Sequence, residues 1–130
     1  MTDTMEPLKI LVCEDERLFA LELKERLERM GHRVVGTAGS GGEAVAMAKN
    51  LEPDLVLMDI GMPRLNGFEA TARLSSECPE VKVIVLSQHE DEVTARRAVK
   101  SGAKGYVLKG AAVEELFAAV RAVCRGQSYF

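Results

Sequence analysis

The sequence lacks the long hydrophobic runs that mark membrane and secreted proteins. Its longest stretch without Asp, Glu, Lys or Arg covers only nine residues, 34–42, whereas a membrane-spanning helix needs about 20 mostly apolar residues. The first residues have neither the basic start nor the apolar segment of a secretory signal. The sequence therefore predicts neither a membrane span nor a secretory signal.

Cysteine and basic residues are too sparse for two further classes. The 3 cysteines (Cys13, Cys78 and Cys124) are an odd number at wide spacings, which favours neither a disulfide framework nor a Cys-x-x-Cys metal site. The 17 basic residues are outnumbered by 20 acidic ones, for a net charge of −3, and nucleic-acid backbones are bound mainly through Lys and Arg. We therefore expect a reducing, cytoplasmic setting and no direct contact of this chain with DNA.

What is present is typical of one folded domain. The chain has 130 residues, of which 47% are hydrophobic and 28% charged, with 11 Gly and 4 Pro. This length is that of a single domain, and this composition excludes disordered, collagen-like and disulfide-scaffold proteins.

Strand-like and helix-like patterns alternate five times along the chain. The β-rich runs are 8–13, 33–38, 54–58, 81–86 and 104–108, and the helical patterns are 17–30, 41–51, 67–77, 91–101 and 111–125. Because consecutive parallel strands need a crossover, and the crossover is usually a helix, this alternation predicts an α/β protein. We expect a doubly wound, five-stranded parallel sheet with helices on both faces.

Several residues predict where helices begin, end and pack. Ser40-x-x-Glu43 and Asn66-x-x-Glu69 are capping-box patterns that open two helices, and Gly102 is a stop signal for the fourth. For the last helix the periodicity predicts a core-facing stripe of Val113, Leu116, Phe117, Val120 and Cys124.

Polar side chains follow the ends of four predicted strands, as Glu14 and Asp15, Asp59, Ser87, and Lys109. The carboxyl ends of parallel strands meet at one edge of the sheet, where ligands bind. Converging carboxylates repel one another unless a cation lies among them, and oxygen ligands without His or thiolate select Mg²⁺ or Mn²⁺. A nearby lysine and a hydroxyl would neutralise and orient a phosphoryl group. The pattern indicates metal-assisted phosphoryl chemistry.

Four segments at these positions together resemble the receiver domain of bacterial two-component response regulators, over essentially the whole chain. They are 11–15, 57–67, 85–87 and 102–109. The resemblance implies a flavodoxin-like (CheY-like) sheet of order 2-1-3-4-5. It also implies a phosphorylation-activated signalling switch rather than an enzyme, one that catalyses only its own phosphorylation and dephosphorylation.

The resemblance also assigns roles to individual residues. Asp59 would accept a phosphoryl group from a sensor histidine kinase, and Lys109 and Ser87 would contact that group. Tyr106 would act together with Ser87 as the switch. The implied ligands of Mg²⁺, for which Mn²⁺ can substitute, are Glu14, Asp15, Asp59 and the backbone carbonyl of Gly61.

Segments 102–110 and 121–130 resemble the NarL/FixJ-type branch, whose receivers are usually joined to a helix-turn-helix domain. We therefore expect residues 1–130 to be a receiver domain, truncated before a C-terminal helix-turn-helix output domain that alone binds DNA. A homodimer on activation is also expected. Many receivers have a proline with a cis bond after the lysine, but here Gly110 follows Lys109, and a non-proline cis bond costs about 2.5–4 kcal/mol.

Three other functions remain as alternatives. A flavodoxin-like FMN protein needs a phosphate-cradling loop after the first strand, where this chain has two carboxylates. An aspartyl phosphatase needs a second aspartate two residues past the nucleophile, where Gly61 stands. The third is a degenerate receiver that only binds proteins, although every position that the chemistry requires is filled.

Overall fold

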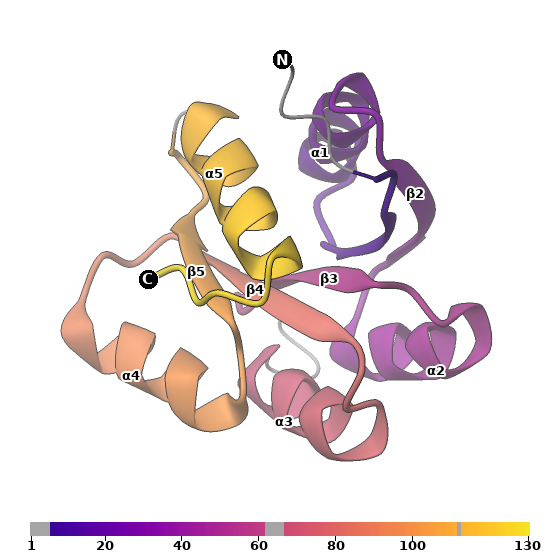
Figure 1. Ribbon diagram of the computed structural model, residues 1–130. Helices are drawn as coiled ribbons and strands as arrows, with labels where there is room; N and C mark the ends of the chain where they lie inside the picture. Colours follow the sequence, from indigo (N-terminus) through magenta and orange to yellow (C-terminus); the bar gives the residue numbers. More distant parts are fainter. Residues whose placement is uncertain (1–5, 62–66, 112) are drawn as a thin grey trace.

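The computed structural model describes residues 6–61, 67–111 and 113–130, and within them five strands and five helices alternate along the chain (Figure 1). The strands are β1 (Lys9–Cys13), β2 (Arg33–Ala38), β3 (Leu55–Asp59), β4 (Lys82–Ser87) and β5 (Gly105–Leu108). The helices are α1 (Arg17–Arg29), α2 (Gly41–Leu51), α3 (Gly67–Glu77), α4 (Glu92–Ser101) and α5 (Val113–Cys124). Each element lies within two residues of its predicted bounds.

All strand pairs are parallel, and the sheet order is β2-β1-β3-β4-β5. This confirms the predicted fold class and strand order. Helices α1 and α5 cover one face of the sheet, and α2, α3 and α4 cover the other (Figure 1). None of the helices in the described ranges is long and apolar enough to cross a membrane.

Two hydrophobic cores lie on the two faces because side chains alternate along each central strand. In β3, Val56 and Met58 belong to the core under α2, α3 and α4, whereas Leu55 and Leu57 belong to the core under α1 and α5. All five residues of β3 are buried. Since burying one such side chain stabilises the fold by about 1.5–3 kcal/mol, the central strands hold the strand ends firmly in place.

The predicted helix ends can be checked at two sites. The Ser40 hydroxyl accepts a hydrogen bond from the Glu43 N–H at 3.2 Å, which confirms Ser40 as the predicted N-cap of α2. Glu43 in turn accepts from the Gly39 N–H at 2.6 Å. Gly102 ends α4 with a φ of +99°, a conformation that favours glycine. Asn66, the other predicted cap, lies outside the described residues.

The predicted core stripe of α5 was partly wrong. Leu116 and Val120 are buried as expected, but Val113, Phe117 and Cys124 are only partly buried. Small and apolar residues occupy most positions of this helix, so its pattern does not define a single face. The residues that are fully buried are Leu116, Ala119, Val120 and Val123.

His32 should make the fold sensitive to acid. Its side chain is 5% exposed, and its Nδ1 accepts a hydrogen bond from the Leu8 N–H at 3.0 Å. Burial lowers the pKa of His32, so on acidification the unfolded chain binds a proton that the folded chain does not. Stability should fall by about 1 kcal/mol as pH drops from about 7.5 to about 5.5.

The measurement is urea unfolding at the two pH values, for the parent and for His32→Asn, whose side-chain oxygen can accept the same bond. We expect the variant to lose less stability on acidification than the parent. Equal losses in both proteins would show that His32 is not the group responsible.

Candidate functional site

Three carboxylates meet at the carboxyl edge of the sheet. Glu14 and Asp15 directly follow β1, and Asp59 is the last residue of β3. One oxygen from each residue lies within 4.8 Å of the others. Glu14 and Asp59 are buried, whereas Asp15 is exposed. The structure thus brings together the three acids that the sequence predicts, in a cluster that could hold a metal ion.

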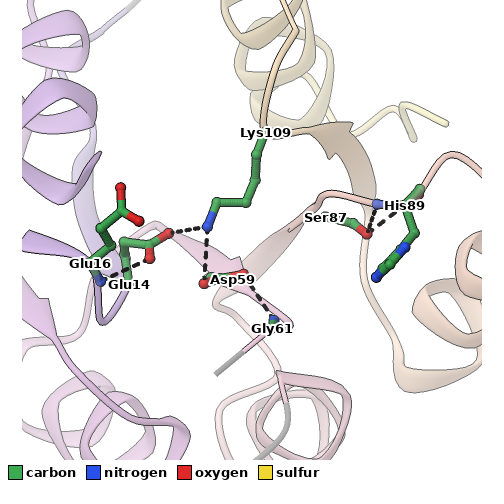
Figure 2. A network of polar contacts seen from close by, with 7 residues as sticks. All are labelled: Glu14, Glu16, Asp59, Gly61, Ser87, His89 and Lys109. Carbon is green, nitrogen blue, oxygen red and sulfur yellow. Dashed lines mark hydrogen bonds and ion pairs between the residues drawn. The ribbon is translucent and has the colours of Figure 1, made fainter. Parts of the chain in front are cut away.

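Lys109 reaches into this cluster from the end of β5 (Figure 2). Its Nζ lies 3.0 Å from Glu14 Oε1 and 3.3 Å from Asp59 Oδ2, and 4.8 Å from the centre of the Phe19 ring. Burial disfavours the charge, but the two carboxylates outweigh it and raise the pKa of Lys109. The ammonium group therefore offsets part of the repulsion among the acids.

The two neighbouring acids differ in what surrounds them. Burial raises the pKa of Glu14, against the opposing effects of the Glu16 N–H and Lys109. Its Oε2 accepts the Glu16 N–H at 3.0 Å, and its Oε1 pairs with Lys109. Asp15, by contrast, presents an exposed side chain to the cleft. Asp15 is therefore better placed to bind a cation directly.

The backbone beside Asp59 is fixed by close packing. Asp59 Oδ1 accepts the Gly61 N–H at 2.9 Å, which holds this residue next to the carboxylate (Figure 2). At the start of α3, a Cβ on Gly67 would lie 2.8 Å from both the Asp59 carbonyl oxygen and the Ile60 Cα. Only glycine allows α3 to begin so close to the end of β3.

Ser87 and Tyr106 both contact His89 and not Asp59. The buried Ser87 Oγ accepts the His89 N–H at 2.9 Å, and the hydroxyl of the partly buried Tyr106 donates to the His89 carbonyl. The Ser87 carbonyl accepts the Lys109 N–H at 2.8 Å, so β4 and β5 end side by side. Figure 2 shows Ser87 directed toward the loop that precedes α4.

An open cleft of about 400 Å³ surrounds the acids. Six of the seven predicted site residues line it, and Tyr106 lies outside. Phe68 and Arg97 also line the cleft, and the sequence did not predict them. The Arg97 guanidinium lies 4.3 Å from the centre of the Phe68 ring. An arginine on a polar helix gives no signal that it faces a site. The predicted residues in the cleft are Glu14, Asp15, Asp59, Gly61, Ser87 and Lys109.

Cys13 precedes the acids and is buried in the core. Burial, followed by the negative charges of Asp59 and Glu14, raises the pKa of its thiol to about 12. Cys13 is therefore a protonated core residue at neutral pH, and the thiolate needed for nucleophilic chemistry does not form.

Lys109→Met should destabilise the fold by about 3 kcal/mol, because it leaves Glu14 and Asp59 as neighbouring buried carboxylates without their cation. Urea unfolding without divalent metal measures this loss. The control is Lys104→Met, which changes an exposed lysine beside the same strand. Mg²⁺ should restore part of the stability of Lys109→Met. A loss of stability no larger than that of Lys104→Met would contradict the claim that Lys109 compensates the charges of Glu14 and Asp59.

The response regulator receiver domain family matches residues 10–121. The chain belongs to this family. It is 39% identical over 123 residues to the response regulator GacA of Pseudomonas aeruginosa, covering 94% of this chain and 58% of that protein. The chain thus spans little more than half the length of this relative. A receiver domain is a signalling module, so membership argues against the flavin-protein and phosphatase alternatives.

Solved structures point to the same branch of the family. A LuxR-family response regulator from Aurantimonas sp. SI85-9A1 matches with a TM-score of 0.92 and 28% identity, covering 96% of this chain and 90% of that one. The receiver domain of NarL from Mycobacterium tuberculosis matches with a TM-score of 0.88 and 29% identity, covering 95% and 100%. The chain is a NarL/FixJ-type receiver.

In the described ranges no peptide bond is cis, and this includes the bond between Lys109 and Gly110.

Proposed function

We propose that this receiver is switched by phosphorylation of Asp59, with the phosphoryl group coming from the phosphohistidine of a sensor kinase. The observation that carries this is the pairing of a buried nucleophilic carboxylate with a lysine at 3.3 Å, inside a cluster of acids. An oxygen of Asp59 forms a bond to phosphorus as the P–N bond of the phosphohistidine breaks. The electron pair goes to the imidazole nitrogen, and an acyl phosphate remains.

The cluster fits a hard divalent cation. Its ligands are all oxygens, and no His or thiolate is among them, which favours Mg²⁺ or Mn²⁺ over softer metals. A bound ion supplies charge neutralisation to the phosphoryl oxygens. Lys109 adds a second positive charge, and Ser87 offers a hydroxyl. The residues that would hold the ion are Glu14, Asp15, Asp59 and the carbonyl of Gly61.

Ser87 is proposed to couple the phosphoryl group to the rest of the domain. Its hydroxyl contacts the His89 backbone in this structure. A phosphoryl group on Asp59 adds acceptor oxygens and negative charge in the same cleft, and the hydroxyl can turn to donate to one of them. The His89 carbonyl, which accepts a hydrogen bond from the Tyr106 hydroxyl, would then shift. The Tyr106 side chain would turn further inward. Phosphorylation thus favours one of two pre-existing states.

Ser87→Ala is expected to accept phosphate nearly as readily as the parent but to respond poorly. In NMR of protein labelled at backbone nitrogen, phosphorylation of the parent should shift signals from Ser87 through Tyr106 into α5. In the variant, shifts should stay near Asp59. Ser87→Thr keeps the hydroxyl and should behave like the parent. If Ser87→Ala and the parent give the same shifts at Tyr106, the hydroxyl is not the coupling group.

The wider assembly follows from the same proposal. We propose that a helix-turn-helix output domain follows residue 130 in the whole protein and controls transcription, as the length of GacA beyond this match suggests. DNA would be bound only through that domain, because the net charge here is −3. The sensor kinase would be the upstream partner. The activated form would be a homodimer, and the protein would act in the cytoplasm.

A further inference from the structure

The residues after α5 pair with the open edge of the sheet. Gly126 has a φ of +85°, which turns the chain back, and Tyr129 then forms a parallel bridge with Gly105. The Tyr129 N–H donates to the Lys104 carbonyl at 2.9 Å, and the Tyr129 carbonyl accepts the Tyr106 N–H at 2.8 Å. Figure 1 shows this last segment running beside β5. Nothing in the sequence pattern predicts this contact.

This pairing is weak enough to be reversible. It consists of one bridge at an edge strand, and only Tyr129 of the segment 127–130 packs against the core under α1 and α5. Gln127, Ser128 and Phe130 are exposed. Short segments with few buried contacts open locally at little cost. Opening this pairing therefore breaks only two backbone hydrogen bonds and the packing of the Tyr129 side chain.

A series of hydrogen bonds joins this pairing to Ser87, which lines the same cleft as Asp59. The Ser87 hydroxyl accepts the His89 N–H, and the His89 carbonyl accepts the Tyr106 hydroxyl. The backbone N–H of the same Tyr106 is bound by Tyr129. Tyr106 thus contacts the loop before α4 with its side chain and the C-terminal segment with its backbone.

We propose that the outer edge of β5 is an interaction surface through which phosphorylation controls the segment 127–130. The segment is paired to β5 in the unphosphorylated domain and leaves it in the phosphorylated one. This rests on the proposed function, since the Ser87 hydroxyl, which donates to the His89 carbonyl at 3.4 Å, must give up that bond to donate to the phosphoryl group, which releases the loop and lets Tyr106 turn. Such coupling is reciprocal. Releasing the segment by mutation must strengthen binding of a phosphoryl mimic at Asp59.

The first test is amide hydrogen exchange by NMR on the whole chain, with and without beryllofluoride plus Mg²⁺. The Gly61 amide, which donates to Asp59, reports whether the mimic binds. The amides of Tyr106 and Tyr129 should then exchange at least about threefold faster. The control is the Lys104 amide, which donates to Val83 inside the sheet and should not change.

The second test compares Tyr129→Pro with Tyr129→Ala. Both variants lose the ring, but only proline loses the N–H that binds the Lys104 carbonyl. Followed at the Gly61 amide in excess Mg²⁺, Tyr129→Pro should bind beryllofluoride roughly two- to tenfold more tightly than Tyr129→Ala, which is the range one hydrogen bond supplies. Phe130→Ala, a change to an exposed side chain, should bind like the parent.

The outcomes separate this inference from the proposed function. If Gly61 responds but Tyr106 and Tyr129 exchange no faster, or if Tyr129→Pro binds no more tightly than Tyr129→Ala, the edge of β5 does not carry the signal. If Gly61 itself does not respond, the proposed function fails. Should Tyr129→Pro not fold, exchange in the parent decides alone.

Discussion

Asp59→Asn should accept no phosphate and, without divalent metal, should be more stable than the parent by about 1 kcal/mol or more. The amide is not a nucleophile, so no acyl phosphate forms. Asp59 faces two carboxylates whose oxygens lie within 4.8 Å and one ammonium group at 3.3 Å. At an effective dielectric constant of about 20, each of these interactions is worth about 3–5 kcal/mol before screening. Two repulsions therefore outweigh one attraction.

Intact mass after incubation with a small phosphodonor and Mg²⁺ measures the first effect, and urea unfolding measures the second. The control is Asp91→Asn. Asp91 caps α4 by accepting the Thr94 N–H at 2.7 Å, and asparagine caps a helix equally well. This control should be phosphorylated like the parent. Phosphate on Asp59→Asn in an amount equal to the parent would refute the assignment.

Asp15→Ala should weaken Mg²⁺ binding by about tenfold or more and abolish phosphorylation. Asp15 is the exposed member of the cluster, so it can offer its carboxylate to an ion without first breaking an internal pair. Both oxygens of Glu14 are already bound, by Lys109 and by the Glu16 N–H. Glu14→Ala should therefore weaken Mg²⁺ binding less, as expected of a carboxylate that reaches the ion through a water molecule rather than directly.

Calorimetric titration with Mg²⁺ gives these affinities. Glu16→Ala is the matched control, because Glu16 lines the same cleft but is not one of the three acids whose oxygens converge. Its Mg²⁺ affinity should stay close to that of the parent. An unchanged affinity in Asp15→Ala would mean that the metal, if it binds, lies elsewhere.

The sheet and the position of the site could be predicted because both depend on strand geometry. Continuous apolar runs such as 55–58 and 83–86 mark strands buried on both faces. Once these strands are parallel, Asp59 and Lys109 must lie at the same edge, whatever their separation in sequence. The pattern of α5 was less informative, because small and apolar residues occupy more than one face of the helix, whereas the face that is buried is that of Leu116, Ala119, Val120 and Val123.

Contacts made by side chains across the site could not be predicted from the sequence. That Lys109 pairs with both Glu14 and Asp59 depends on where β5 ends. The Ser87 hydroxyl turns to the nearby His89 N–H because that donor needs an acceptor. The bridge between Gly105 and Tyr129 depends on backbone bonds, which carry no residue-specific signal.

The central claim is that Asp59 alone accepts a phosphoryl group, and that a divalent cation is required. The most direct measurement is incubation with phosphoramidate, whose P–N bond resembles that of phosphohistidine, followed by borohydride reduction and peptide mass analysis. Borohydride converts an aspartyl phosphate to homoserine and so marks its position. We predict one phosphate per chain, only with Mg²⁺ or Mn²⁺, and conversion at Asp59 alone. No phosphate in the presence of Mg²⁺, or conversion at any other residue, would contradict the account.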